Sequence, residues 1–242
     1  MSEFKIPTEI VELPSKGILY PKDSELAKGV VEMKYMTARE EDILTNQSYI
    51  KNGTVLDKLM KSLIVSPIKY DDLLIGDKNA IMIAARVLGY GKDYTFEYLG
   101  EEHTVDLSTL ENKPLHTIVE SSDKNEFEFT LPHSGNHLTF RFLTHKDEQD
   151  ITRELEGLKK INKDSSPELS TRLKYIITSV EGKTEKKDVR TFVDNYLLAK
   201  DSRALREYIK ELQPDVDMSY FPSDGSNRFN IPIGISFFWP EF

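Results

Sequence analysis

The chain contains no cysteine in its 242 residues. Disulfide bonds, thiolate metal sites and cysteine nucleophiles are therefore excluded. The sequence also lacks a run of about 20 apolar residues, which a membrane-spanning helix requires, and its N-terminus lacks the pattern of a signal peptide. There is no long run of basic residues, and the net charge is −9. Because an acidic surface repels phosphate groups, we expect neither nucleic acid nor a membrane as a partner.

Sequence signatures of enzymes are also missing. The pair Gly89-Tyr90-Gly91 follows an expected helix, so it fits a helix C-terminus better than a phosphate-binding loop. Neither G-x-S-x-G nor H-E-x-x-H occurs. His133 and His137 flank an expected turn, but a metal site needs a third ligand. We therefore predict no catalytic residues, no metal, no cofactor and no small-molecule substrate.

The hydrophobic pattern alternates between helical and extended segments without regular βαβ order. A capping box at Thr37–Glu40 predicts a helix to about Ile50. Further helices are expected after Thr54, over 78–88 with Asp77 as its cap, over 145–161 after Thr144, from Pro167, and over 187–199 and 201–212, the last capped by Asp201. Strands are expected at 30–35, 94–98, 103–107, 126–131, 137–143, 218–221 and 228–233. We therefore predict an α+β fold in which helical parts surround small antiparallel hairpins, not a doubly wound sheet.

These patterns divide the chain into five consecutive segments. They are an N-terminal arm and strand (1–36), a helical segment (37–92), a β-rich hairpin region (93–143), a second helical segment (144–213), and a C-terminal hairpin with an aromatic tail (214–242).

The last segment is unusual because it ends in an apolar tail that holds three Phe and the only Trp of the chain. Chain ends are normally polar. The tail either closes the core or anchors the chain to a partner, since Trp is enriched at interface hot spots. Arg203 and Arg206 lie three apart on an expected helix, and they could hold a carboxylate of a partner or pair within the chain. The candidate partner or docking contacts are Leu13, Pro14, Tyr20, Arg203, Arg206, Phe237, Phe238 and Trp239.

An ordered set of short segments carries a resemblance to a known family. The segments are Leu13-Pro14-Ser15-Lys16-Gly17 with Tyr20-Pro21, Thr37-Ala38-Arg39-Glu40-Glu41-Asp42, Asp71-Asp72-Leu73-Leu74-Ile75-Gly76-Asp77, Ala85-Arg86, Tyr90-Gly91-Lys92-Asp93-Tyr94, Asp201 to Arg206, Pro214-Asp215-Val216-Asp217, and Ile231 to Gly234 with Phe237 to Pro240. In this order the chain resembles the baseplate hub proteins of T4-like contractile-tailed bacteriophages. The resemblance spans nearly the whole chain. It implies a role in assembly and no catalysis of a covalent reaction.

One departure from the family pattern concerns zinc. Many members carry two Cys-x-x-Cys pairs, which suit a shared four-thiolate zinc site. Here the matching stretches, 98–103 and 220–225, hold no cysteine, so zinc is not expected. If the two hairpins still meet, apolar contacts must replace the metal, and the candidates are Tyr98, Leu99, Tyr220 and Phe221.

The resemblance leaves alternatives for the function. The leading expectation is a structural component of the baseplate hub, which acts through contacts with other baseplate or tail proteins. Its expected location is the virion tail baseplate, and the host cytoplasm during assembly. The first alternative is a transient assembly chaperone that is absent from the mature virion. The second is a hydrolase that uses two of the chain's many carboxylates, whose spacing a sequence cannot give.

Overall fold

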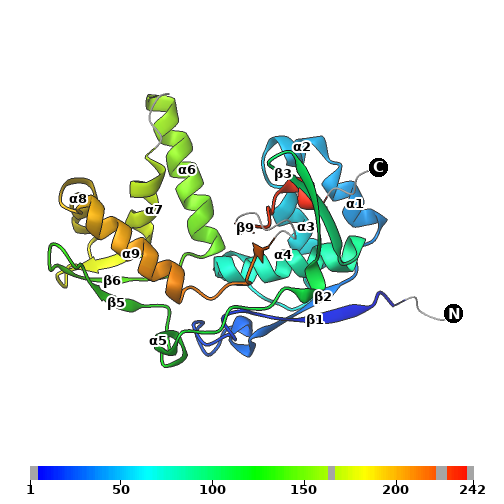
Figure 1. Ribbon diagram of the computed structural model, residues 1–242, viewed down its shortest axis with the longest axis horizontal. Helices are drawn as coiled ribbons and strands as arrows, with labels where there is room; N and C mark the ends of the chain where they lie inside the picture. Colours follow the sequence, from blue (N-terminus) through cyan, green and yellow to red (C-terminus); the bar gives the residue numbers. More distant parts are fainter. Residues whose placement is uncertain (1–4, 163–166, 222–227, 239–242) are drawn as a thin grey trace.

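The computed structural model describes residues 5–162, 167–221 and 228–238. Within them, helices are combined with antiparallel sheets of two or three strands. The prediction of an α+β fold is confirmed. Figure 1 shows two lobes side by side, the first built from the N-terminal half and the last strands, the second from the segments between. No helix in the described ranges is long and apolar enough to cross a membrane.

The first lobe begins with a strand pair and continues into helices. Strand β1 (Thr8–Glu12) pairs antiparallel with β2 (Val30–Lys34), and helices α1 (Ala38–Leu44), α2 (Gln47–Lys51) and α3 (Val55–Leu63) follow. The single helix expected to Ile50 is therefore wrong. Asn46 interrupts it, because its side chain accepts from the backbone N–H groups of Ser48 and Tyr49 and caps α2.

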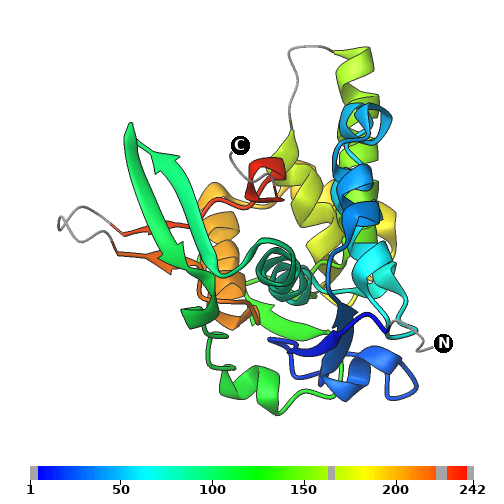
Figure 2. The ribbon, with the colours of Figure 1, turned by 90° about the vertical axis from the view of Figure 1, so that its right-hand side faces the viewer.

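Helix α4 (Ile75–Tyr90) is the central element of the first lobe, and Figure 2 looks nearly along its axis. It is apolar on most of its surface, and Ile81 and Ala85 are fully buried. The helix begins three residues earlier than predicted, after Leu74, so Asp77 lies within its first turn and is not its cap. It ends at Gly91, where a φ of +87° favours glycine.

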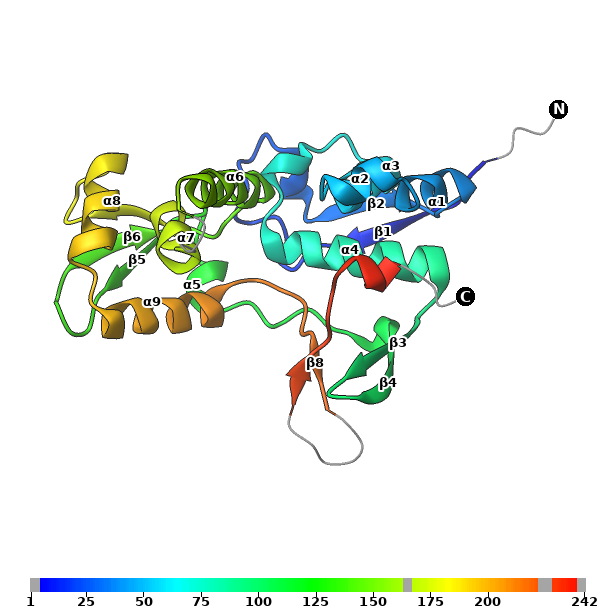
Figure 3. The same cartoon turned by 90° about the horizontal axis from the view of Figure 1, so that it is seen from above.

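Two hairpins from distant parts of the sequence lie on the same side of α4 (Figures 2 and 3). Strands β3 (Asp93–Tyr98) and β4 (Glu101–Asp106) join through Leu99 and Gly100, both at positive φ, as a tight hairpin requires. Strands β8 (Ser219–Tyr220) and β9 (Phe229–Asn230) return from the second lobe, shorter than predicted. Figures 2 and 3 show this second hairpin beside the first.

The second lobe packs four helices on a three-stranded sheet. Strands β5 (Phe127–Thr130) and β6 (His137–Phe140) form the predicted hairpin, and β7 (Ile177–Val180) pairs with β6. The helices are α6 (His145–Ile161), α7 (Glu168–Ile176), α8 (Lys186–Asn195) and α9 (Ala199–Leu212), while the short helix α5 (Thr117–Glu120) precedes the sheet. Strand β7 was not predicted, because the chain passes from helix α7 into it without a turn signal.

Aromatic rings fill the space between this sheet and its helices. Phe127, Phe140 and Phe142 are buried and in mutual ring contact. Phe129 instead stacks on Tyr208 of α9, with the ring centroids 4.7 Å apart. These contacts fix α9 on the sheet. Short 3-10 helices complete the fold, namely η1 (Glu25–Lys28), η2 (Tyr70–Asp72), η3 (Leu107–Thr109) and η4 (Ile235–Phe238).

Candidate functional site

The N-terminal arm is inserted into the first lobe. Leu13, Pro14 and Tyr20 are all buried, with 5% of Tyr20 exposed. These three candidate contacts are therefore covered by the chain itself. Their burial follows from the turn at Lys16 and Gly17, both at positive φ, which folds the arm back onto η1.

A buried carboxylate holds this arm on α4. Asp77 accepts hydrogen bonds from Ser15 N–H (2.9 Å), Ser15 Oγ (2.6 Å) and the Tyr20 hydroxyl (2.6 Å). The Tyr20 oxygen in turn accepts from Leu74 N–H at 2.9 Å. Burial raises the pKa of the Asp77 carboxyl, and burial together with the Asp77 charge raises the pKa of Tyr20. The network links the arm to the start of α4, and this replaces the capping role predicted for Asp77.

The neighbouring residue Gly76 brings a third part of the chain to the same place. A Cβ at Gly76 would lie 1.8 Å from the carbonyl oxygen of Pro214, so only glycine fits. Asn79, one turn further along α4, donates to Asp215 Oδ1 at 3.0 Å. The start of α4 is therefore fixed to both the N-terminal arm and the segment that returns from α9.

The two arginines singled out on α9 do not converge on one acceptor. Both are exposed; Arg203 pairs with Glu207 at 2.8 Å, and Arg206 Nε donates to the backbone oxygen of Ser202 at 3.3 Å. Asp201 lies in the first turn of α9 and does not cap it. Its two oxygens accept from the backbone N–H groups of His133 and Ser134, at 2.8 and 3.0 Å. The carboxylate therefore ties the turn after β5 to α9.

The described rings of the aromatic tail point inward. Phe237 and Phe238 are fully buried, with perpendicular rings 5.2 Å apart. Phe237 also meets Tyr94 of β3 edge-on, with the ring centroids 4.7 Å apart. These two residues close the core of the first lobe, whereas Trp239 lies outside the described residues.

An aromatic cluster joins the two hairpins of the first lobe. Tyr98 stacks on Phe229 with the ring centroids 3.7 Å apart. Phe96 and His103 each contact both Tyr220 and Phe229, with centroids 5.4–5.9 Å apart. The prediction that ring and apolar contacts bring the hairpins together without cysteine is confirmed. We call these five residues the hairpin junction.

Two of the four residues proposed for this junction were wrong. Leu99 is 88% exposed and Phe221 68% exposed, because each lies at or beyond the end of its strand. Sequence reasoning missed Phe96, His103 and Phe229. Strand periodicity could have found Phe96, because it shares a face with Tyr98. His103 and Phe229 require the cross-strand register, which places them opposite Phe96 and Tyr220.

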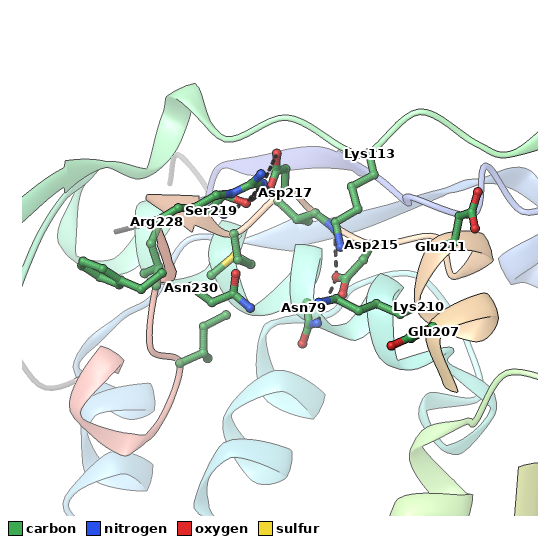
Figure 4. A pocket seen from close by; sticks show the side chains of 15 residues that line it. Asn79, Lys113, Glu207, Lys210, Glu211, Asp215, Asp217, Ser219, Arg228 and Asn230 are labelled. Carbon is green, nitrogen blue, oxygen red and sulfur yellow. Dashed lines mark hydrogen bonds and ion pairs between the residues drawn. The ribbon is translucent and has the colours of Figure 1, made fainter. Parts of the chain in front are cut away.

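A cavity of about 860 Å³ borders the junction (Figure 4). Strands β8 and β9, the segment at Lys113 and the end of α9 line it with side chains of both charges. Figure 4 shows Asp215 beside Asn79, and Asp217 beside Ser219 and Arg228. The Ser219 hydroxyl and the Arg228 guanidinium hold the pKa of Asp217 below its usual value. Asp215 and Asp217 each also accept a hydrogen bond from a nearby backbone N–H, of Val216 and Ser219 respectively, so these two carboxylates fix the backbone around the cavity.

A second polar cluster connects the lobes. His145 at the start of α6 lies 3.0 Å (Nδ1) from Lys78 Nζ and 3.1 Å (Nε2) from Asp57 Oδ2. Lys78 also pairs with Asp57 at 3.1 Å. Burial opposes the charge of Asp57, but the contacts with His145 and Lys78 outweigh it and lower its pKa. Backbone bonds beside the cluster, Ile75 N–H to Leu143 O and His145 N–H to Leu73 O, complete the connection.

Most titratable groups with shifted pKa values thus form hydrogen bonds or ion pairs that connect different elements of the fold. Within the described residues, no group of three or more His, Asp or Glu side chains is placed to hold a metal ion. Comparison of the chain with protein-family models, with curated proteins and with solved structures found no match.

Proposed function

We propose that this chain is a structural component of the baseplate hub of a contractile-tailed bacteriophage. In this proposal it acts through contacts with other baseplate or tail proteins during tail assembly, and it catalyses no covalent reaction. It needs no cofactor and binds no nucleic acid, membrane or small-molecule substrate. It resides in the virion tail baseplate after assembly in the host cytoplasm. The ordered segments that resemble the baseplate hub family support this proposal.

The observation that carries the proposal is the way these segments meet. The segment 13–17 contacts the segment 71–77 through Ser15 and Asp77. The same segment 71–77 packs through Gly76 against Pro214. If the family shares these segments because they stabilise a common fold, the segments are expected to contact one another, as they do here.

Two further segments of the resemblance also contact each other. Arg86 donates to the backbone oxygens of Gly91 (3.2 Å) and Asp93 (3.3 Å), and its guanidinium lies over the rings of Tyr90 and Tyr94. Tyr94 then contacts Phe237 of the tail. These matching residues therefore form contacts between elements of the first lobe, and Asp201 forms one in the second. This distribution favours a shared scaffold over a shared catalytic centre, because catalytic residues would gather around one cavity.

Disruption of the gene in the parent phage tests the proposal. We expect particles or free tails without a complete baseplate in electron micrographs, and restoration when the chain is supplied from a plasmid. A variant with both Ser15→Ala and Asp77→Asn should restore assembly less well than Glu41→Gln, an exposed control on α1. Normal baseplates in the disrupted phage would contradict the proposal.

A further inference from the structure

A slot runs between β1 and the segment 108–115 on the underside of α4. Two adjoining cavities, of about 590 and 420 Å³, form it, and Glu12 and Asn112 line both. In Figure 2, β1 (dark blue) lies on one side below α4 and the segment that leads to α5 (green) lies on the other. Four consecutive residues of β1, from Glu9 to Glu12, line the slot. Successive side chains of a strand point to opposite faces, so a slot lined by consecutive residues lies along an edge of the strand. The edge of β1 that faces away from β2 therefore borders the slot.

The backbone of β1 has unused hydrogen-bonding groups on this edge. The bonds from Leu13 N–H to Gly29 O and from Tyr35 N–H to Pro7 O mark the bonded positions of its ladder with β2. These positions alternate in an antiparallel pair, so the bonded residues of β1 are Glu9 and Val11. The N–H and C=O groups of Thr8, Ile10 and Glu12 point away from β2. Within the described part of the chain these groups have no hydrogen-bond partner.

The opposite wall of the slot presents the same kind of edge. Lys113 N–H donates to Asp215 O, and Asp217 N–H donates to Glu111 O. Asn112 lies between these bonds, opposite Val216, so its own N–H and C=O point away from Val216. Asn112 borders the slot together with Glu12. Backbone groups therefore face the slot from both walls, and each such group favours a partner.

The chemistry of the slot identifies what it fits. Its floor is apolar, with Ala80, Ile83, Ala84, Val87 and Leu88 of α4. Acidic residues stand at the end where β1 begins (Glu9 and Glu111), and Lys16 and Lys113 stand at the other end. The two walls run in the same chain direction, since higher residue numbers of one meet higher numbers of the other. One inserted strand can therefore be antiparallel to both walls at once, which is the more stable pairing.

We propose that this slot binds an extended segment of a partner protein as an added β-strand, hydrogen-bonded to β1 on one side and to Asn112 on the other. The segment runs antiparallel to β1. It is acidic at its N-terminal end, which lies near Lys16 and Lys113, and basic at its C-terminal end, near Glu9 and Glu111. Its alternate side chains are apolar and rest on α4. The inference is independent of the proposed place in a baseplate.

A tethered probe tests the proposal with the full chain. The peptide Glu-Val-Thr-Val-Thr-Val-Lys is fused ahead of Met1 through a Gly/Ser linker of about eight residues, which gives an effective concentration of the order of millimolar. Backbone amide exchange is followed by NMR. We expect the amides of Ile10, Glu12 and Asn112 to exchange at least about tenfold more slowly than in the untethered chain. A probe with its two end charges reversed should protect them less.

Proline variants distinguish a loss of binding in the slot from a disruption of the fold. Ile10→Pro removes an N–H that faces the slot and leaves the bonded positions of the β1–β2 ladder in place, whereas Ile10→Thr keeps that N–H. We expect Ile10→Pro to abolish the probe-dependent protection of Asn112 and Ile10→Thr to retain it, with the amides of Glu9 and Val11 protected in both. Glu12→Pro with Glu12→Thr gives a second matched pair.

Three results would overturn the proposal. The first is unchanged exchange of all three amides in the tethered chain, and the second is protection of Asn112 that survives both proline variants. The third is a dimer of the untethered chain in which Ile10 and Glu12 are already protected, because a second copy would then occupy the slot.

Discussion

Tyr98 on β3 and Phe229 on β9 lie face to face, with 3.7 Å between the ring centroids and 17° between the ring planes. The two residues come from hairpins separated by the whole second lobe in sequence. Their contact, with the rings of Phe96, His103 and Tyr220 around it, holds the C-terminal hairpin on the first lobe.

This contact predicts an energetic coupling between the two hairpins. A double-mutant cycle with Tyr98→Ala and Phe229→Ala should give a coupling of about 0.5–1.5 kcal/mol in the free energy of unfolding, as expected for paired aromatic rings. Chemical denaturation measures it. A matched cycle with Leu99→Ala should give a coupling near zero, because Leu99 is 88% exposed at the adjacent turn. Equal couplings in both cycles would show that the stacking makes no specific contribution.

The residues of the hairpin junction could be predicted only in part from the sequence. Tyr98 and Tyr220 were correct candidates because both lie on strands of hairpins that meet. Leu99 and Phe221 failed because a hairpin turn points its side chains into solvent. Phe96 follows from strand periodicity, because it shares a face with Tyr98. His103 and Phe229 follow only when the cross-strand register is known, and register depends on the exact turn.

The N-terminal caps of helices were predicted correctly only where the capping contacts are local in sequence. The capping box at Thr37 and the cap at Thr144 were predicted correctly. Both form a capping box in the structure, because a hydroxyl and an acid three residues later satisfy each other locally. The prediction that Asp77 and Asp201 cap their helices is wrong. Each occupies the third position of its helix behind a leucine, which has no hydroxyl to bond. Such a carboxylate bonds instead to residues distant in sequence, and no local pattern reveals which.

The Asp77 network should make the Tyr20 hydroxyl important for stability. We expect Tyr20→Phe to lower the free energy of unfolding by about 1–3 kcal/mol, since Leu74 N–H would lose its acceptor and Asp77 a donor in a buried place. Tyr35→Phe is the control, because that hydroxyl contacts Glu9 at an exposed position; its loss should stay within about 0.5 kcal/mol. Equal effects measured by urea denaturation would refute the role given to this network.

Glu40 predicts part of the acid sensitivity of the fold. Burial opposes its charge, but hydrogen bonds from Lys34, Thr37 and Ser62 outweigh that and lower the pKa of Glu40 to about 2, from an ordinary value of 4.5. A depressed pKa means that the charged form stabilises the folded state above pH 4.5 and that this stabilisation is lost as the pH falls toward 2.

Glu40→Gln should therefore reduce stability at neutral pH by about 3 kcal/mol and flatten the pH dependence in that acidic window. Denaturation curves recorded between pH 2 and 7 in both proteins test this. Glu41→Gln, at the exposed next position, should leave the slope unchanged. If the free energy of unfolding of Glu40→Gln falls with acidic pH as steeply as that of the unchanged protein, the role given to Glu40 is contradicted.

The tail is predicted to belong to the core up to Phe238. Phe237→Ala should cost about 3–5 kcal/mol of stability, because it removes a fully buried ring that meets Tyr94 and Phe238. Tyr196→Ala, at a ring that is 66% exposed, should change stability by less than about 0.5 kcal/mol. A folded Phe237→Ala protein of normal stability that fails in assembly would make this ring an interface anchor instead.

The most direct test of the proposed structural role is quantitative mass spectrometry of purified particles of the parent phage. The proposal predicts peptides of this chain in a fixed, reproducible ratio to the other baseplate proteins, retained after the particles are banded on a density gradient. Absence of the chain from particles, in a phage whose baseplate fails to form when the gene is disrupted, would contradict the structural role and identify a transient assembly chaperone.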